Sequence, residues 1–165
     1  MLDLSGIVED SIVDGPGIRV TVFCQGCPHH CPGCHNPETW PFSGGTPMDT
    51  ETMVSIVASN PRCKGVTFSG GECLMQPKFV LEMLRRCREE KISTAIDTCG
   101  FLPWPSLERT LGLCDTYLYD IKCADPELHQ RFTGQRNDII LENFRKLSAS
   151  WASIWVRIPV IPGFN

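Results

Sequence analysis

Three cysteines lie close together in the spacing Cys27-x3-Cys31-x2-Cys34, on a segment rich in proline, glycine and histidine. Three thiolates on one tight loop can bind three irons of a cubane iron–sulfur cluster, which leaves the fourth iron without a protein ligand. An iron with an open coordination position can bind a small molecule and take part in its chemistry. The spacing therefore predicts a cluster that does more than carry electrons.

A fourth thiol, Cys24, leaves other interpretations open. Cys24-x2-Cys27 and Cys31-x2-Cys34 read together resemble two knuckles of a closed zinc site or of an electron-transfer cluster, and a disulfide is a third alternative. However, Cys24 ends the run 18–24, which is rich in β-branched residues and alternates like a half-buried strand. We therefore interpret Cys24 as a small buried hydrophobic residue and favour the three-thiolate cluster.

Length and composition indicate one domain over residues 1–165, with enough apolar content for a core. The net charge of −4, without a basic stripe, gives no support for binding nucleic acid or a membrane. The first residues do not resemble an export signal, and no stretch is apolar enough to span a bilayer. With ten cysteines, the chain is expected to work in a reducing cytoplasm, in an anaerobic setting that protects an exposed cluster.

Strand-like and helix-like segments alternate along the chain. We expect strands at 19–23, 65–68, 92–97, 116–121 and 154–161, and helices at 49–58, 76–90, from Pro105 onwards, and at 140–151 with Trp151 facing inward. Repeated strand–helix units predict a parallel sheet with right-handed crossovers. The expected fold is therefore α/β, an open or partial (β/α) barrel.

Functional residues of such folds lie in the loops that follow the carboxyl ends of the strands. Polar clusters occur at those points: the cysteine loop, Ser69-Gly-Gly-Glu72, Asp97-Thr-Cys-Gly100, Asp120-Ile-Lys122 and Arg157. We expect them to meet in one site.

Each cluster suggests a role beside an ordinary structural one. Gly70 and Gly71 allow a close approach of backbone to ligand, and Glu72 offers a carboxylate to a cation such as an amine. Asp97 and Asp120 would form a polar floor for a ribose, a metal cation or a carboxylate. Alternatively, these two aspartates cap helices or form salt bridges with Lys122 or Arg157, which would otherwise meet an anionic ligand group.

The remaining candidates are single residues. His35 follows the last cluster cysteine, which favours a role in the site, whereas Asp14 lies in a Gly/Pro turn where aspartate is common. His29 and His30 are interpreted as loop surface. Of the other cysteines, Cys87 and Cys114 are expected in the core, and Cys73, Cys99 and Cys123 beside the site.

Three of these motifs together, Cys27-x3-Cys31-x2-Cys34, Ser-Gly-Gly-Glu and Asp-Thr-Cys-Gly, resemble those of the radical S-adenosylmethionine enzymes. More narrowly, the chain resembles the glycyl-radical-enzyme activating enzymes of the pyruvate formate-lyase activase type over almost its whole length. The segments that carry this narrower resemblance are 13–19, 34–40, 119–122, 129–134 and 155–163.

The resemblance implies the cofactors and their ligands. Cys27, Cys31 and Cys34 would bind a [4Fe–4S] cluster, and the methionine amine and carboxylate of S-adenosylmethionine would chelate its open iron. The other roles that it implies are as follows: Gly70, Gly71 and Glu72 bind the methionine amine; Gly33 and His35 lie against the adenosyl part; Asp97, Thr98 and Asp120 hold ribose or a monovalent cation; Lys122 and Arg157 lie near the methionine carboxylate; and Asp14 lies near the glycine loop of the partner.

The resemblance also implies the reaction. A one-electron donor, flavodoxin or ferredoxin, reduces the cluster, S-adenosylmethionine is cleaved, and the 5′-deoxyadenosyl radical takes a hydrogen from a glycine of a large partner glycyl radical enzyme. Three other functions are kept open: an activator of anaerobic ribonucleotide reductase, a radical S-adenosylmethionine enzyme that acts on a small molecule, and a non-catalytic iron–sulfur or zinc scaffold that uses Cys24.

The chain departs from the family pattern in three ways. Cys63 is the only cysteine between Cys34 and Ser69, so we expect no inserted ferredoxin-like domain of the kind that many activases carry. The chain ends after the fifth expected strand, so the barrel would lack its last strand and helix, either by truncation or because the form is naturally short. Gly33 also stands where the wider family often has an aromatic residue.

Overall fold

The computed structural model describes residues 1–163 and 165. Its sheet has seven strands in the order β3-β1-β2-β4-β5-β6-β7. The strands are β1 (Leu2–Ser11), β2 (Arg19–Cys24), β3 (Thr46–Met48), β4 (Gly65–Gly70), β5 (Ser93–Thr98), β6 (Thr116–Asp120) and β7 (Ile154–Arg157). The α-helices are α1 (Thr50–Ser59), α2 (Pro77–Glu89), α3 (Trp104–Glu108), α4 (Pro126–Thr133) and α5 (Asp138–Ser148).

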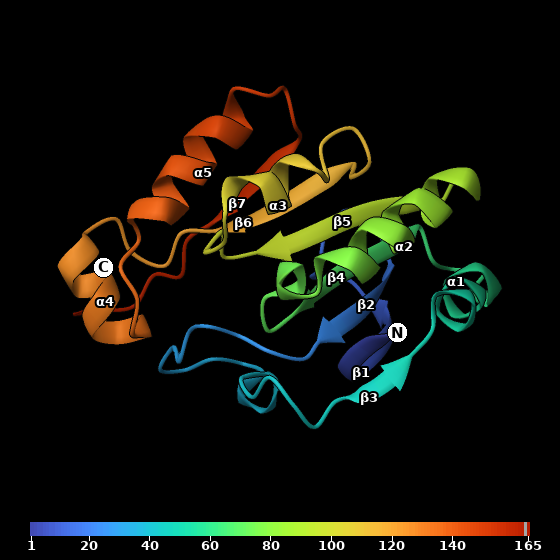
Figure 1. The fold of residues 1–165 in the computed structure, drawn as a ribbon, viewed down its shortest axis with the longest axis horizontal. Helices are drawn as coiled ribbons and strands as arrows, with labels where there is room; N and C mark the ends of the chain where they lie inside the picture. Colours follow the sequence, from blue (N-terminus) through green and yellow to red (C-terminus); the bar gives the residue numbers. More distant parts are fainter. Residues whose placement is uncertain (164) are drawn as a thin grey trace.

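Five neighbouring strands, β2, β4, β5, β6 and β7, are parallel, as predicted. Helices α1, α2, α3 and α5 lie along the outer side of the curved sheet, and α4 lies beside the loop that follows β2 (Figure 1). The first five residues of β4 are all buried, as expected for a strand that is covered on both faces. The architecture is an α/β partial barrel, and β7 is shorter than the predicted 154–161.

Two antiparallel strands at one edge were not predicted. β1 pairs antiparallel with β2, and the three-residue β3 pairs antiparallel with β1. In β1 only Leu2, Leu4 and Ser11 are buried, so its hydrophobic alternation is too short to identify a strand of this length. The sheet is therefore mixed, with an antiparallel edge on a parallel centre.

The helices follow their sequence signals with three exceptions. Helix α3 ends at Glu108, so Leu111 and Cys114, which were expected on the helix from Pro105 onwards, lie beyond it. Helix α4 was not predicted, although Asp125 caps its first turn by accepting a hydrogen bond from the Leu128 amide at 2.8 Å. Helix α5 ends at Ser148, and the Trp151 side chain is 99% exposed, so the prediction that Trp151 faces inward was wrong. The chain turns there with a φ of 64° at Trp151, which carries the ring away from the core.

A buried arginine joins three strands at the amino ends of the sheet. Arg19 is fully buried, and its guanidinium donates hydrogen bonds to the Thr67 hydroxyl at 2.7 Å and to the carbonyls of Val66 at 2.7 Å and Ser93 at 3.1 Å. Beside it, a Cβ added to Gly65 would lie 2.0 Å from the Ser93 carbonyl oxygen. The close approach of β4 and β5 therefore requires glycine at position 65.

No helix in the part of the chain that the structure describes is both long and apolar enough to cross a membrane.

We expect Gly65→Ala to lower the free energy of unfolding by about 1–3 kcal/mol, because the added methyl group forces β4 away from β5. Urea denaturation followed by circular dichroism measures this. Gly6→Ala is the matched control, since a Cβ there meets no atom within 4 Å, and it should change stability little. Equal losses in both variants would contradict the packing argument.

Candidate functional site

A cavity of about 520 Å³ opens at the carboxyl ends of the parallel strands. It collects residues from the cysteine loop, from the turn that holds Asp14, and from the ends of β4, β5, β6 and β7. The predicted site residues that line it are Asp14, Cys27, Cys31, Gly33, Cys34, His35, Gly70, Gly71, Asp97, Asp120, Lys122 and Arg157. Of the predicted set, Glu72 and Thr98 lie behind this lining.

Backbone hydrogen bonds fix both arms of the cysteine loop. The amides of Gly26 and Cys27 donate to the carbonyls of Thr39 at 2.7 Å and Trp40 at 3.2 Å. Between Cys27 and Cys31, the His30 amide donates to the Thr133 carbonyl of α4 at 3.0 Å. The loop is thereby held between its own returning chain and a helix that is distant in sequence.

The three predicted ligands share the cavity as free thiols. Burial raises the pKa of Cys27 to about 12 and also raises the pKa of Cys31. Within the described ranges, no three His, Cys, Asp or Glu side chains are already gathered closely enough to hold a metal ion. As a donor set, three thiols on one loop facing one cavity fit an iron–sulfur cluster, and its binding would draw them together and release their protons.

Cys24 lies outside this cavity. It is fully buried on β2 as part of the hydrophobic core, and burial raises the pKa of its thiol. The prediction that Cys24 is a buried hydrophobic residue is confirmed. A closed four-thiolate site would require β2 to release this side chain from the core.

The strand end at Gly70 and Gly71 lies directly against the start of the cysteine loop. Gly70 has a φ of 102°, and a Cβ there would lie 2.3 Å from the Cys24 amide nitrogen. The Gly71 and Glu72 amides donate to the carbonyls of Cys24 at 2.9 Å and Gly26 at 2.8 Å. Only glycine allows this approach, and both residues line the cavity.

The carboxylate of Glu72 has its partners inside the protein. The Thr98 hydroxyl lies 2.9 and 2.8 Å from its two oxygens, and the amides of Cys99 and Leu74 donate to it at 2.9 and 3.2 Å. Burial raises the pKa of Glu72 despite these donors. In this structure the side chain joins the end of β4 to the end of β5, and its expected contact with an amine stays a prediction.

Asp97 and Asp120 face two cations at the ends of β5 and β6. Arg157 donates to Asp120 at 2.7 Å and also to Asp97, and Lys122 lies 2.5 Å from the second oxygen of Asp120. Burial and the nearby Asp120 raise the pKa of Asp97, and Arg157 opposes this. The salt bridges considered from the sequence are thus present, and they form the floor of the cavity.

Asp14 and His35 approach the cavity from its two sides. Asp14 accepts hydrogen bonds from the hydroxyls of Ser11 at 2.5 Å and Thr21 at 2.9 Å, which orient its carboxylate. His35 is exposed and follows the last cysteine of the loop. Both residues line the cavity without blocking it.

His29 is the main residue that sequence reasoning misplaced. It was interpreted as loop surface, but its ring is 2% exposed and packs against Phe101, at 5.1 Å between ring centroids. Burial lowers its pKa to about 4, so the ring is neutral near pH 7. Asp125 followed by Pro126 is a signal for the start of a helix. Recognising it would have predicted α4, whose His129 packs against His29.

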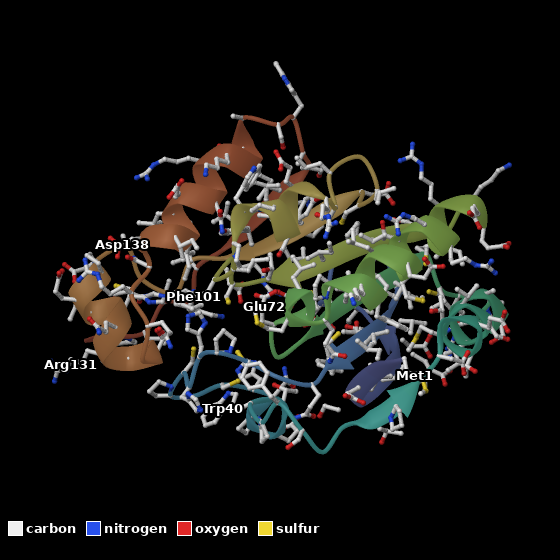
Figure 2. The ribbon with its side chains drawn as sticks, in the orientation of Figure 1. Met1, Trp40, Glu72, Phe101, Arg131 and Asp138 are labelled. Atoms are coloured by element: carbon white, nitrogen blue, oxygen red, sulfur yellow. The ribbon has the colours of Figure 1, made fainter. Side chains whose placement is uncertain are left out.

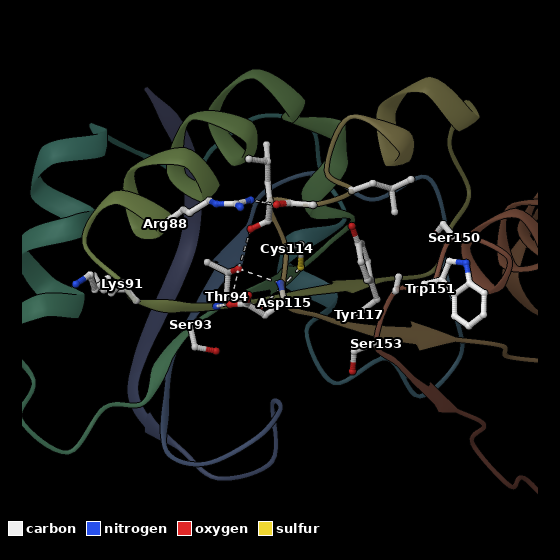
Figure 3. Close-up of a pocket in the computed structure, with 15 residues that line it drawn as sticks. Arg88, Lys91, Ser93, Thr94, Cys114, Asp115, Tyr117, Ser150, Trp151 and Ser153 are labelled. Carbon is white, nitrogen blue, oxygen red and sulfur yellow. Dashed lines mark hydrogen bonds between the residues drawn. The ribbon is translucent and has the colours of Figure 1, made fainter.

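A second cavity, of about 840 Å³, lies at the amino ends of β5, β6 and β7 between Arg88, Lys91 and Trp151 (Figure 3). Among the described residues that line this second cavity, Cys114 is the only one with a thiol, and that thiol donates to the Thr116 carbonyl at 3.1 Å. Although it is larger, this cavity lacks the thiols and paired carboxylates of the first one. The smaller cavity is therefore the candidate active site.

Comparisons with known proteins agree with this choice. A family model described as "4Fe-4S single cluster domain" matches residues 13–141. The pyruvate formate-lyase-activating enzyme of Clostridium pasteurianum is 37% identical, over 96% of this chain and 68% of the relative. The pyruvate formate-lyase 1-activating enzyme of Escherichia coli K12 is 37% identical over 93% and 65%, so the chain spans about two thirds of these relatives.

Other matches extend the same relationship. The trans-4-hydroxy-L-proline dehydratase activating enzyme of Clostridioides difficile is 31% identical over 94% of this chain and 72% of its own. A domain of pyruvate-formate lyase-activating enzyme from Bacteroides vulgatus superposes with a TM-score of 0.57 at 35% identity, covering 61% and 63% of the two chains. A TYW1 structure superposes with a TM-score of 0.66 at 13% identity, over 89% and 57%, and supports the fold alone.

We expect Thr98→Val to lower the free energy of unfolding by about 1.5–3 kcal/mol, because a buried carboxylate loses its hydroxyl donor without a change in side-chain shape. Chemical denaturation at pH 7 measures the loss. Thr98→Ser keeps the hydroxyl and should retain most of the stability. A valine variant as stable as the serine variant would show that Glu72 does not depend on this hydrogen bond.

Proposed function

We propose, on the premise that this chain belongs to the radical S-adenosylmethionine family of glycyl-radical-enzyme activating enzymes, that it installs the glycyl radical of a partner enzyme. Our main support is the meeting of three loop thiols and four polar strand ends in one cavity. In this proposal the cavity binds a [4Fe–4S] cluster and S-adenosylmethionine. When bound and reduced, the cluster supplies the electron that cleaves S-adenosylmethionine to methionine and a 5′-deoxyadenosyl radical.

The residues of the chain would bind and orient the substrate. The backbone of Gly70 and Gly71 suits the methionine amine, since carbonyl groups can approach it without side chains in between. Lys122 and Arg157 suit the methionine carboxylate, because both cations already lie at the floor of the cavity. A carboxylate bound there would compete with Asp97 and Asp120 for Arg157.

That competition gives Asp97 and Asp120 their proposed second role. Without Arg157, Asp97 would keep the Ser69 hydroxyl and Asp120 would keep Lys122, so each carboxylate would have an oxygen free for a further partner. Ribose hydroxyls or a monovalent cation would supply one, with Thr98 behind Asp97 at the same strand end. Gly33 and His35, on the exposed arm of the loop, would lie against the adenosyl part, and Asp14 would face the partner's glycine loop.

We further propose that the activity belongs to the cytoplasm of an anaerobic cell, with flavodoxin or ferredoxin as the electron donor. All ten cysteines are free thiols, as expected in a reducing compartment. The partner would be a large glycyl radical enzyme of the pyruvate formate-lyase type, as the names of the 37%-identical relatives suggest.

Cluster reconstitution tests the proposal. The chain is loaded anaerobically with iron and sulfide, reduced, and given S-adenosylmethionine, and 5′-deoxyadenosine is measured by chromatography. We expect Cys31→Ala to abolish product because a cluster ligand is lost, and the matched Cys24→Ala to retain both cluster and product. Loss of the metal in Cys24→Ala would instead favour the closed scaffold.

The partner is tested separately. The reduced chain is mixed with pyruvate formate-lyase or with anaerobic ribonucleotide reductase, and the glycyl radical is followed by electron paramagnetic resonance. A radical only on the lyase supports the proposed activity, whereas a radical only on the reductase supports the alternative activator.

A further inference from the structure

His29 lies inside the cysteine loop, between two of the three proposed cluster ligands, and its ring is almost completely buried. It lines the cavity that the thiols share. Its Nε2 atom is buried and, among the described residues, has no hydrogen-bond partner. Buried polar atoms of proteins are nearly always paired, so this nitrogen needs a partner that the described residues do not supply.

The ring is held firmly from the side of α4. Phe101 lies 5.1 Å away and His129 lies 5.6 Å away between ring centroids, the latter edge-on at 75°. Gln135, just after α4, donates to the Pro28 carbonyl at 3.4 Å. Figure 2 labels Phe101 in the region between α4 and the strand ends. A side chain packed in this way has little freedom to choose another partner.

The neighbouring histidine is occupied in a way that fixes its own proton. His129 Nδ1 lies 2.6 Å from the Gln135 carbonyl oxygen, which can only accept, so we assign the hydrogen to Nδ1. Its Nε2 then carries a lone pair and forms no hydrogen bond with a described residue. Phe101, the other ring that packs against His29, has no polar side-chain atom. The His129 lone pair does not accept from His29, since neither Nε2 atom has a partner among the described residues, and the thiols of Cys27 and Cys31, which flank His29 in the sequence, are the other candidate acceptors.

We propose that His29 is a positioning residue of the cluster, whose Nε2–H donates a hydrogen bond to a sulfur of the cluster or of its cysteine ligands. This inference rests on the proposed function, because it requires the cluster to bind at Cys27, Cys31 and Cys34. Hydrogen bonds to cluster sulfurs stabilise the more negative, reduced form and raise the reduction potential. His29 would therefore make the cluster easier to reduce by a weak donor.

The test compares two histidines of the same loop. His29→Phe keeps an aromatic ring and removes the N–H, whereas the control His30→Phe changes an exposed ring that meets Trp40 edge-on at 5.0 Å between ring centroids. Each full-length chain is reconstituted, its iron is counted, and its potential is measured by redox titration followed by electron paramagnetic resonance. We expect His29→Phe to disfavour reduction by about tenfold, which is 59 mV for one electron, and His30→Phe to leave it unchanged.

His29→Gln separates the hydrogen bond from packing, because its amide is also a donor. Its cluster should load and should have a potential between those of the wild type and His29→Phe. An unchanged potential in His29→Phe, or a glutamine variant that matches phenylalanine or fails to load, overturns the inference while wild-type loading leaves the proposed function intact. A wild-type chain that binds no cluster would overturn the proposed function itself.

Discussion

The register of the parallel strands is the constraint on which the site depends. In the strand register, Cys24 pairs with Gly70, Thr98 pairs with Tyr119, and Asp120 pairs with Arg157. The polar segments that follow these strands therefore begin at one edge of the sheet. A slip of one residue in any pair would turn a whole strand over and remove its buried face from the core. The core thus brings the functional residues to the same edge of the sheet, where Arg157 pairs with Asp97 and Asp120.

The carboxylates at this edge differ in the kind of partner that they have. Glu72 is fully buried and accepts from neutral donors of the backbone and of Thr98, which are parts of the fold. Asp97 and Asp120 are partly buried and pair with Arg157, a long side chain that reaches in from β7. Asp97 also accepts from the Ser69 hydroxyl, and Asp120 also pairs with Lys122. A ligand can displace a flexible cation more readily than a backbone amide, so the partners of the aspartates are easier to exchange than those of Glu72.

The sequence was sufficient wherever a local pattern determined the structure. The apolar run before Ser69 and the polar residues after it predicted both β4 and its contribution to the site. Distant contacts decided the rest: β1 is a strand because β2 pairs with it, and His29 is buried because α4 and Phe101 cover it. Trp151 was predicted inward from helical spacing, but the chain leaves the helix three residues earlier. Spacing indicates a face only while the helix continues.

The cysteine loop is held by backbone hydrogen bonds, but its thiols are not yet arranged for a metal. Hydrogen bonds to Thr39 and Trp40 fix its start and one to Thr133 fixes His30 within it, but the three thiols are not gathered around one point in the structure described. Because burial raises the pKa of Cys27 to about 12, the thiol keeps its proton until a metal takes its place. Cluster binding would therefore supply the energy for the last step of loop ordering. The hydrogen bonds at Gly26, Cys27 and His30 would limit that step to a few residues of the loop.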